Sequence, residues 1–415
     1  MIVKTVLFFL ALWISEVSYA QIAGCTDPQA NNFNNEATVN DGSCNYPATV
    51  HNPQFAFELS NAISETSGLA FFNEKLWTFN DSGGAAILYA IDTTTSLIVQ
   101  QISISNAYNI DWEDITIDED YVYIGDFGNN SGTRTDLVVY KVSREAIPAV
   151  GNVSVTAEKI YFSYPDQIIF ERSKNHNFDC EAMVSAGEHL YLFSKNRGDD
   201  KTKLYRIPKT PKTYVANLLD EFNSYGLITG ADYNQETNEV ILTGYTQKTY
   251  TAFLWILFDF DGTVFFSGNK RRIELVNLFT TQIEGITYFT GKEAFISSEK
   301  SQSFSARVFR FSTAKWTDHV SFNVDVKPSS KKKLLVINNP VQNNLLKIVT
   351  DESLKGKFRI DLTDSLGSLI FQDYVTCGNG ENSFIEIDIT GYKPGVYNFT
   401  LFTNRRSFTV PFIQP

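Results

Sequence analysis

Five short segments of the sequence repeat one pattern, and this repeat limits the possible folds more than any other feature. Each segment has an oxygen-bearing residue, then usually a small or polar residue, then a run typical of a β-strand. The segments begin at Ser67, Glu113, Glu181, Thr229 and Glu284. Their spacings are 46, 68, 48 and 55 residues, and an all-strand repeat of about 40–50 residues is typical of a β-propeller. The repeat therefore predicts an all-β chain with a propeller over residues 50–318.

Two further strands are predicted after each lead residue, because the side chains alternate as they do in half-buried strands. The second strands are Leu76–Asn80, Tyr121–Asp126, His189–Lys195, Glu239–Tyr245 and Glu293–Ser298. The third strands are Ile87–Asp92, Leu137–Val142, Lys203–Ile207, Thr251–Phe258 and Arg307–Ser312. We expect the strand Phe55–Leu59 to complete the last blade and close the ring. Five blades are predicted, and six are allowed because the 68-residue spacing has room for another.

The bulk composition excludes some classes of function. The formal net charge is −12, which argues against general nucleic-acid binding because that needs a basic surface. Residues 1–20 have Lys4, an apolar stretch and small residues before Gln21, as in a secretory signal. No other stretch approaches the roughly 18 apolar residues of a transmembrane helix. We therefore expect an exported protein at the outer-membrane surface or outside the cell, without a transmembrane segment.

Residues 21–47 are predicted to form a small module with a disulfide between Cys25 and Cys44, because so short a segment has no real core. The module resembles the short modules with the pattern GCTDP…A…DGSC on exported Bacteroidetes proteins. Its Asp27, Asn40 and Asp41 suit either a Ca²⁺ site or a tight Asn-Asp-Gly turn. The other two cysteines, Cys180 and Cys377, are expected to be small packed residues.

The last part of the chain is predicted to be a separate small β-sandwich. Residues 319–333 are polar and rich in lysine, as in a linker, and short strands with turn signals follow over residues 334–415. The pattern Asn339-Pro340, Asp364–Ile370 and Pro394-Gly395-Val396-Tyr397 resembles the C-terminal sorting domain of type IX secretion cargo. This resemblance implies that the type IX machinery is a partner of residues 334–415. The alternative is an adhesive sandwich, because a fold alone does not give a function.

A propeller would bring the five lead residues together at its central axis. Three glutamates there would repel one another unless a cation or shared protons intervene. Carboxylate and hydroxyl oxygens suit Ca²⁺, whereas Zn²⁺ prefers His and Cys, and the four histidines show no paired spacing. We therefore expect an axial Ca²⁺ held by Ser67, Glu113, Glu181, Thr229 and Glu284. The alternative is a hydrogen-bonded hub with shared protons.

The loops between the second and third strands should lie at the same end of the axis as the lead residues. They offer Asp81 and Asp126 as catalytic acids. For substrate binding they offer Arg134, Lys195, Arg197, Tyr245 and Lys300. Acids and cations beside a metal suit hydrolysis of a phosphoester. The alternative for each loop residue is ordinary surface polarity.

The order Ser, Glu, Glu, Thr, Glu over five repeats resembles the calcium-activated nucleotidases (apyrases), which are five-bladed propellers with an axial Ca²⁺. The loop Phe79–Gly84 resembles the Phe-Asp-Asp-Arg-Thr-Gly loop of that family, with Ser82 in place of the arginine and Asn80 in place of the first aspartate. The resemblance implies a Ca²⁺-dependent site that hydrolyses a phosphoester or another anionic substrate. The alternative is a propeller without enzymatic activity that binds a glycan, a small molecule or a protein.

Overall fold

The computed structural model of the chain describes residues 21–278, 282–318 and 334–414, the last range with short gaps at 338, 340, 342–343, 351–353, 366, 378–382 and 404–406. The expected signal at 1–20, the expected linker at 319–333 and two residues of the sorting motifs, 340 and 366, lie outside the described residues. The chain divides into two compact units between residues 319 and 320. None of the helices in the described ranges is long and apolar enough to cross a membrane.

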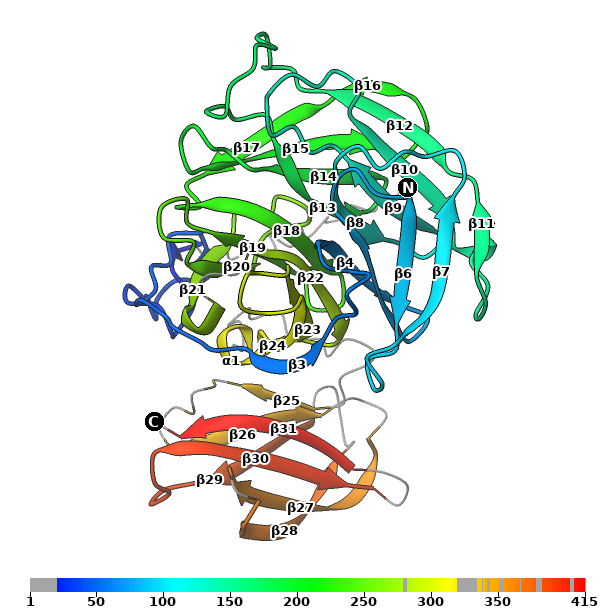
Figure 1. Cartoon of the computed structure of the whole chain (residues 1–415). Helices are drawn as coiled ribbons and strands as arrows, with labels where there is room; N and C mark the ends of the chain where they lie inside the picture. The colour runs from blue at the N-terminus through cyan, green and yellow to red at the C-terminus, as the bar shows by residue number, and fades with distance from the viewer. Residues whose placement is uncertain are drawn as a thin grey trace, which may run out of the picture. The chain divides into compact units, whose positions relative to one another are not determined.

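The first unit is a β-propeller whose blades are five antiparallel sheets (Figure 1). The first two blades consist of β4 (Thr66–Phe72), β5 (Lys75–Asn80), β6 (Ile87–Ile91) and β7 (Ile98–Ile104), then β8 (Trp112–Ile117), β9 (Tyr121–Asp126), β10 (Val138–Ser143) and β12 (Glu158–Ser163). The third and fourth consist of β13 (Cys180–Ala186), β14 (His189–Ser194), β15 (Thr202–Pro208) and β17 (Asn217–Phe222), then β18 (Leu227–Asn234), β19 (Glu239–Tyr245), β20 (Ala252–Phe258) and β21 (Asn269–Leu275). The fifth consists of β22 (Ile283–Thr290), β23 (Glu293–Ser298), β24 (Arg307–Ser312) and β3 (Gln54–Glu58).

The ring closes as predicted. Strand β3, from the start of the unit, pairs antiparallel with β24 from its end, with Val308 opposite Phe57. The inner strands β4, β8, β13, β18 and β22 each lie against the next, and β22 lies against β4. Closure joins the two ends of the propeller through backbone hydrogen bonds and leaves no gap between the last blade and the first.

The 68-residue spacing does not hold a sixth blade. Its extra residues form the 3₁₀ turn η1 (Arg144–Ala146), the short strand β11 (Val153–Val155) and a long loop before β13. Strand β11 adds in parallel to β7 of the first blade, and β16 (Thr213–Val215) adds in parallel to β12 of the second. Each of these two short strands therefore adds a fifth strand to the blade that precedes its own.

The cores of the propeller lie between blades, as expected when half-buried strands pack face to face. Five clusters of buried side chains each combine residues of two neighbouring blades, and a sixth lies in the second unit, among the described residues. Between the first two blades, for example, Trp77 packs with Trp112 and Tyr140. One cluster joins Phe295 of the fifth blade to Leu76 of the first, which again completes the circle. Cys180 is buried without a disulfide, as predicted.

The N-terminal module contains β1 (Ala23–Gly24), β2 (Val39–Asn40) and the predicted disulfide between Cys25 and Cys44. It packs on the fourth blade, where the Arg271 guanidinium lies 4.9 Å from the ring centre of Tyr46. The Asn40 amide donates to Asn269 Oδ1 at 3.0 Å. Two short helical segments also belong to the propeller unit: η2 (Val276–Leu278) precedes β22, and α1 (Ala314–Thr317) follows β24.

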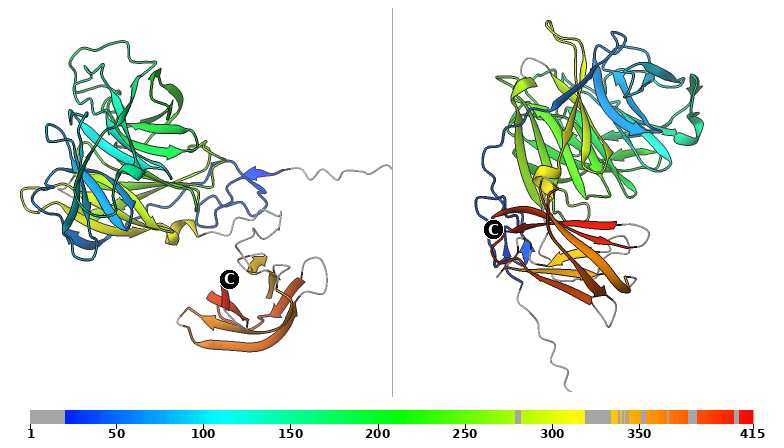
Figure 2. Two further views of the ribbon diagram at one scale, coloured as in Figure 1. Left: turned by 90° about the vertical axis from the view of Figure 1, so that its right-hand side faces the viewer. Right: turned by 90° about the horizontal axis from the view of Figure 1, so that it is seen from below.

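The second unit is a sandwich of two sheets (Figures 1 and 2). The first sheet consists of β25 (Leu334–Ile337), β26 (Leu345–Thr350) and β29 (Ser383–Asp388). The second consists of β28 (Leu369–Cys377), β27 (Gly356–Asp364), β30 (Gly395–Phe402) and β31 (Ser407–Gln414). The strands β25 and β31 were not predicted. The core between the sheets includes Leu346, Leu362 and Phe399, and Cys377 is packed there without a disulfide.

Candidate functional site

A β-bulge lies at the lead position of every inner strand. The pairing register skips there in all five blades, at Thr66/Leu69, Trp112/Asp114, Cys180/Ala182, Ile228/Gly230 and Ile283/Ile286. The skipped residues include the five lead residues. A bulge turns a side chain away from the regular alternation of the strand and is common next to active sites. The repeated pattern of the sequence therefore corresponds to a repeated distortion of the backbone at one end of the axis.

The small residue after three of the lead residues is required by close packing around the axis. A Cβ atom on Gly68 would lie 2.6 Å from the Cα of Asp114. Equivalent atoms on Gly230 and Gly285 would lie 2.3 Å and 2.4 Å from backbone oxygens of the next blade. Real Cβ atoms do not approach backbone so closely, so glycine is needed wherever neighbouring inner strands approach each other in this way.

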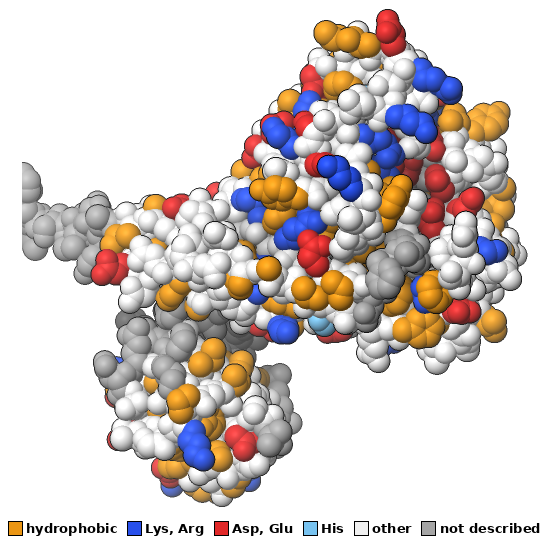
Figure 3. All heavy atoms as spheres, turned by 60° about the vertical axis from the view of Figure 1, so that its left-hand side comes forward, with side chains coloured by type: hydrophobic (Ala, Val, Ile, Leu, Met, Phe, Trp, Pro, Cys, Tyr) orange, Lys and Arg blue, Asp and Glu red, His pale blue; other side chains and the backbone are white. Residues whose placement is uncertain are grey.

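A cavity of about 250 Å³ lies where the lead residues and the loops meet. Eight of the predicted site residues line this cavity: Ser67, Glu113, Glu181, Glu284, Asp81, Lys195, Arg197 and Tyr245. It also includes Asn130, Tyr250, Gln282 and Glu299. Figure 3 shows Asp and Glu side chains gathered on the propeller unit beside Lys and Arg side chains. Four of the five lead residues and four loop residues therefore share one small polar cavity.

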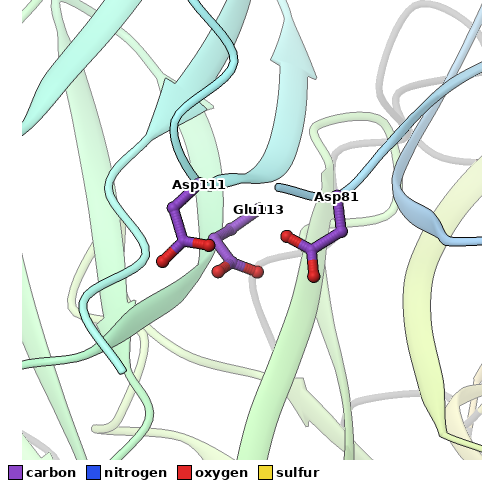
Figure 4. Close-up of side chains that lie close together, drawn as sticks. All are labelled: Asp81, Asp111 and Glu113. Atoms are coloured by element: carbon purple, nitrogen blue, oxygen red, sulfur yellow. The ribbon is translucent and has the colours of Figure 1, made fainter. Parts of the chain in front are cut away.

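Three carboxylates come together at one side of this cavity. Asp81, Asp111 and Glu113 each offer an oxygen atom, and these atoms lie within 4.8 Å of one another. Figure 4 shows the three side chains pointing toward one another. Glu113 is 5% exposed, and among the described residues its carboxylate has neither a hydrogen-bond partner nor an ion pair. One oxygen of Asp81 is also buried, with no hydrogen-bond partner in the part of the chain that the structure describes.

The backbone around these acids fixes their positions. The side-chain amide of Asn109 donates from its nitrogen to the carbonyl oxygen of Asp81 at 2.6 Å. The Asn109 Oδ1 atom accepts the N–H of Trp112 at 3.2 Å. A Cβ atom on Gly128 would lie 2.1 Å from Glu113 Oε1 and 2.5 Å from Asp111 Oδ2. Glycine at position 128 therefore leaves the space that the two carboxylates occupy.

Burial and mutual repulsion make these acids hard to ionise. Burial, with the charges of Asp81 and Asp179, raises the pKa of Asp111 to about 7. Burial and the neighbouring acids also raise the pKa of Glu113. Across the cavity, burial and the charge of Glu284 raise the pKa of Glu299 to about 8. Such a set either keeps protons or binds a cation in their place.

The opposite wall is neutralised by protein cations. Lys195 forms an ion pair with Glu181, and both side chains are 4% exposed. The Arg197 guanidinium lies 3.0 Å from Asp179 Oδ2 and 3.6 Å from Glu181 Oε1. Burial alone would lower the pKa of Lys195, but the charge of Glu181 raises it well above its usual value. Both cations are therefore charged and already paired with acids.

Four of the predicted site residues lie outside the cavity lining. Arg134 forms ion pairs with Asp126 at 2.9 Å and Asp136 at 3.0 Å. Asp126 also accepts the N–H of Asp111 at 3.1 Å, so it holds the backbone of Asp111 and is not placed for catalysis. Thr229 donates its hydroxyl to the carbonyl oxygen of Ile283 at 2.6 Å. Lys300 is exposed on the surface. The candidate site therefore excludes these four residues.

Asp111 was not predicted, because it precedes the repeated segment and belongs to neither the lead residues nor the loops. Its sequence signal is the spacing Asp-x-Glu, which places two acids on the same side of an extended chain. Tyr250 and Gln282 were also not predicted. Tyr250 lies in the loop between β19 and β20, and Gln282 comes directly before β22, so neither is a lead residue nor one of the predicted loop residues.

The N-terminal module favours the turn over the Ca²⁺ site. Asn40 Oδ1 accepts the N–H of Gly42, and Asp41 Oδ1 accepts the N–H of Ser43. Gly42 has φ of 72°, as a tight turn requires. Asp27 accepts the hydroxyl of Tyr46 at 2.6 Å. These oxygens are used in local bonds that shape the module.

A larger cavity of about 510 Å³ lies at the other end of the inner strands. Its half-buried acid, Asp232, accepts the N–H of Tyr288 at 2.7 Å and the hydroxyl of Thr287 at 3.1 Å. This carboxylate joins the fourth blade to the fifth through hydrogen bonds. We therefore assign it to the packing of the blades and place the candidate site at the acidic end.

Comparison with known proteins gives no family for this chain. No family model and no curated protein matches it. Solved structures that resemble it include PorZ, a surface component of the type IX secretion system of Porphyromonas gingivalis, at 13% identity and TM-score 0.33, covering 95% of this chain and 51% of PorZ. The chain thus spans about half the length of PorZ.

Two further structures resemble the chain at a similar level. An exo-β-1,3-galactanase from Phanerochaete chrysosporium has 10% identity and TM-score 0.39, covering 91% of this chain and 92% of the galactanase. Regucalcin from Agrobacterium tumefaciens, a calcium-binding protein, has 10% identity and TM-score 0.35, covering 64% of this chain and 95% of regucalcin. Such low scores assign no activity to this chain, whose propeller is defined by its own five sheets and closed ring.

Proposed function

We propose that the cavity at the acidic end of the propeller axis is a divalent-cation site, and that Ca²⁺ is its cation. The observation that carries the proposal is the buried Glu113 carboxylate without a protein partner, facing Asp81 and Asp111. A buried carboxylate normally has a hydrogen-bond or charge partner, and a bound cation would supply one. Oxygen ligands of this kind suit Ca²⁺, and no histidine lines the cavity among the described residues.

The activity that we propose for this site is hydrolysis of a phosphoester or another anionic substrate. A bound cation would polarise an oxygen of the substrate and offset the charge of the acids around it. Asp81 lines the cavity beside this cation, where its carboxylate would orient the attacking water. Lys195 and Arg197 hold the positive charge of the opposite wall.

A second candidate is binding without turnover, of a glycan or a protein. It is favoured by the ion pairs of Lys195 and Arg197, because cations that are already paired offer less to an anionic substrate than free ones. In this case the cation would serve only to hold oxygen atoms of the ligand.

Calorimetric titration of the purified protein with Ca²⁺ and with Mg²⁺ tests the cation site. We expect Ca²⁺ to bind and Glu113→Gln to abolish this binding. Glu158→Gln, at a glutamate of the same blade whose side chain is 57% exposed, is the matched control and should bind Ca²⁺ as the wild type does. Equal binding by wild type and Glu113→Gln would reject the site.

Assays of the wild type with nucleotides and generic phosphoesters, with Ca²⁺ and after chelation, separate the two candidates. Turnover that disappears on chelation and in Glu113→Gln supports the hydrolase. Ligand capture without turnover, measured on a glycan or peptide array, supports the binding protein instead.

We also propose that the protein is exported and that residues 334–415 are the sorting domain of type IX secretion cargo. The Cys25–Cys44 disulfide supports export, because disulfides persist in oxidising compartments. The two-sheet sandwich of the second unit is compatible with a separable sorting domain. Deletion of residues 334–415 should leave the protein in the periplasm, as measured by fractionation. Normal surface delivery of the shortened chain would contradict this.

A further inference from the structure

Tyr250 has an unusual backbone for its residue type. It lies in the loop between β19 and β20, with φ of 52°. This left-handed region is disfavoured for residues with a side chain and is usually filled by glycine or asparagine. Strained residues of this kind are concentrated at functional sites.

The loop around Tyr250 holds it in this conformation. The N–H of Tyr250 donates to the carbonyl oxygen of Thr246 at 2.9 Å. The hydroxyls of Thr246, Thr249 and Thr251 form a chain, with neighbouring oxygens 2.6 Å and 2.8 Å apart. The Gln247 amide fastens the loop to the third blade by donating to the carbonyl oxygen of Arg197 at 3.0 Å. These hydrogen bonds therefore hold the backbone of Tyr250 in place before any ligand binds.

Packing alone does not account for this ring. Tyr250 lines the cavity and is 49% exposed. One side of it stacks on the buried Tyr245, with ring centres 5.6 Å apart and an angle of 20° between the planes. A half-exposed aromatic ring beside a polar cavity, carried on a strained and hydrogen-bonded loop, is suited to stacking against part of a ligand.

We propose that Tyr250 is a stacking platform for the ring of an anionic sugar whose acidic group is held by the cation at Asp81, Asp111 and Glu113. The inference rests on the cation site proposed above. A sugar ring presents an apolar face to an aromatic ring and hydroxyls to everything else, and the other groups around this cavity are polar side chains such as Asn130 and Gln282. A volume of about 250 Å³ accommodates one such ring unit, since pockets for larger ligands are about 300–1,000 Å³.

Calorimetric titration at saturating Ca²⁺ tests this with two pairs of probes, each a ring compound and its open-chain counterpart. The pairs are glucuronate with gulonate, for a carboxylate, and glucose 6-phosphate with sorbitol 6-phosphate, for a phosphate. We expect the ring compound of at least one pair to bind more tightly, and the pair that discriminates identifies the acidic group. Tyr250→Gly should weaken its binding by roughly threefold to tenfold, whereas Tyr250→Phe should keep it.

The melting temperature distinguishes a platform from a packing residue. Glycine adopts the left-handed backbone without strain, so Tyr250→Gly should leave the melting temperature unchanged or higher. Tyr225→Gly is the matched control, because Tyr225 has φ of 53°, is 62% exposed and does not line the cavity. It should leave sugar binding unchanged.

Several results would overturn the inference. Equal binding of ring and open-chain probes would do so, as would unchanged sugar binding in Tyr250→Gly. Phenyl phosphate binding as tightly as glucose 6-phosphate would assign the platform to an aryl group instead of a sugar. A wild type that binds no Ca²⁺ in the absence of sugar would overturn the proposed function itself, whereas Ca²⁺ binding without preference for a ring would overturn this inference alone.

Discussion

Replacing Asp111 by asparagine should stabilise the Ca²⁺-free propeller and abolish Ca²⁺ binding. Asp111 is an acid whose charge is opposed by burial and by Asp81 and Asp179, so its pKa rises from 3.8 to about 7. A carboxyl whose pKa is higher in the folded protein contributes stability that is present at low pH and is lost as the pH rises through the folded pKa. At pH 8 the ionised group therefore opposes folding.

The size of the effect follows from the displaced pKa. At about 1.4 kcal/mol per pKa unit, moving the pKa from 3.8 to about 7 costs on the order of 4 kcal/mol once the group is ionised. Asparagine removes this cost, so the free energy of unfolding at pH 8 should rise by up to that amount. At pH 5 the native carboxyl is mostly protonated, and the gain should shrink to about 1.5 kcal/mol.

Urea unfolding followed by tryptophan fluorescence measures this for the propeller alone, because the tryptophans outside residues 1–20 are at positions 77, 112, 255 and 316. Adding Ca²⁺ should raise the stability of the wild type, since a ligand that binds only the folded state stabilises it, and should leave Asp111→Asn unchanged. If the variant were less stable than the wild type at pH 8 without Ca²⁺, or bound Ca²⁺ equally well, the electrostatic reasoning would be wrong.

Asp126→Asn is the matched control, with the same chemistry in the same blade. Asp126 is fully buried and is paired with Arg134. Burial raises the pKa of Asp126, but the charge of Arg134 opposes that rise, and neutralising Asp126 leaves the Arg134 guanidinium with one fewer acid. Asp126→Asn should therefore gain less stability at pH 8 than Asp111→Asn. Equal gains would point to a general effect of removing negative charge.

Three further predictions concern the same region. Gly128→Ala should weaken Ca²⁺ binding at least about tenfold in calorimetric titration, because the alanine methyl group would occupy the space of the Glu113 and Asp111 carboxylates. Unchanged affinity would show that the acids move aside freely. Ca²⁺ affinity should rise between pH 6 and pH 8. The pKa is about 7 for Asp111 and about 8 for Glu299, so protons compete with the cation at lower pH. A flat profile in titrations at pH 6, 7 and 8 would argue against this. Thr229→Val should lower the unfolding free energy by about 1 kcal/mol through loss of one buried hydrogen bond, and should leave Ca²⁺ binding intact. Loss of Ca²⁺ binding would instead return Thr229 to the site.

The inner part of each blade could be predicted from the sequence because it obeys a simple rule. Strands such as Tyr121–Asp126 and Glu239–Tyr245 are buried along almost their whole length, so their side chains are mostly apolar, and they were placed with their observed bounds. The outer strand β17 (Asn217–Phe222) is exposed along almost its whole length, so no alternation marks it. The three-residue strands β11 and β16 exist only through parallel pairing with a preceding blade, which a local pattern does not contain.

The candidate site was predicted in part, for a physical reason that separates its two kinds of residue. Lead residues such as Glu113 and Glu284 occupy a repeated backbone position, so periodicity alone brings them to the axis. Loop residues follow no period, and their side chains choose partners after folding. Asp126 and Arg134 were both assigned to the site from their place in one loop, yet they form an ion pair with each other. Such pairing depends on side-chain direction, which the sequence does not show.

The distribution of charge divides the cavity into two halves with different tasks. On one half, Glu181 and Asp179 are paired with Lys195 and Arg197, so the charges of these two acids are balanced without a bound cation. On the other half, no lysine or arginine among the described residues forms an ion pair with the acids Asp81, Asp111 and Glu113, the set within 4.8 Å.

A cation would therefore bind asymmetrically, on one side of the axis instead of at its centre. All five lead residues could surround a central ion, but Glu181 is already paired and Thr229 is bonded to the next blade. An ion beside Glu113 leaves the rest of the cavity, up to the ring of Tyr250, for the ligand that it holds. This asymmetry is what allows one small cavity to contain both a cation and a sugar ring, and an ion found equidistant from Glu113, Glu181 and Glu284 would leave no room for that arrangement.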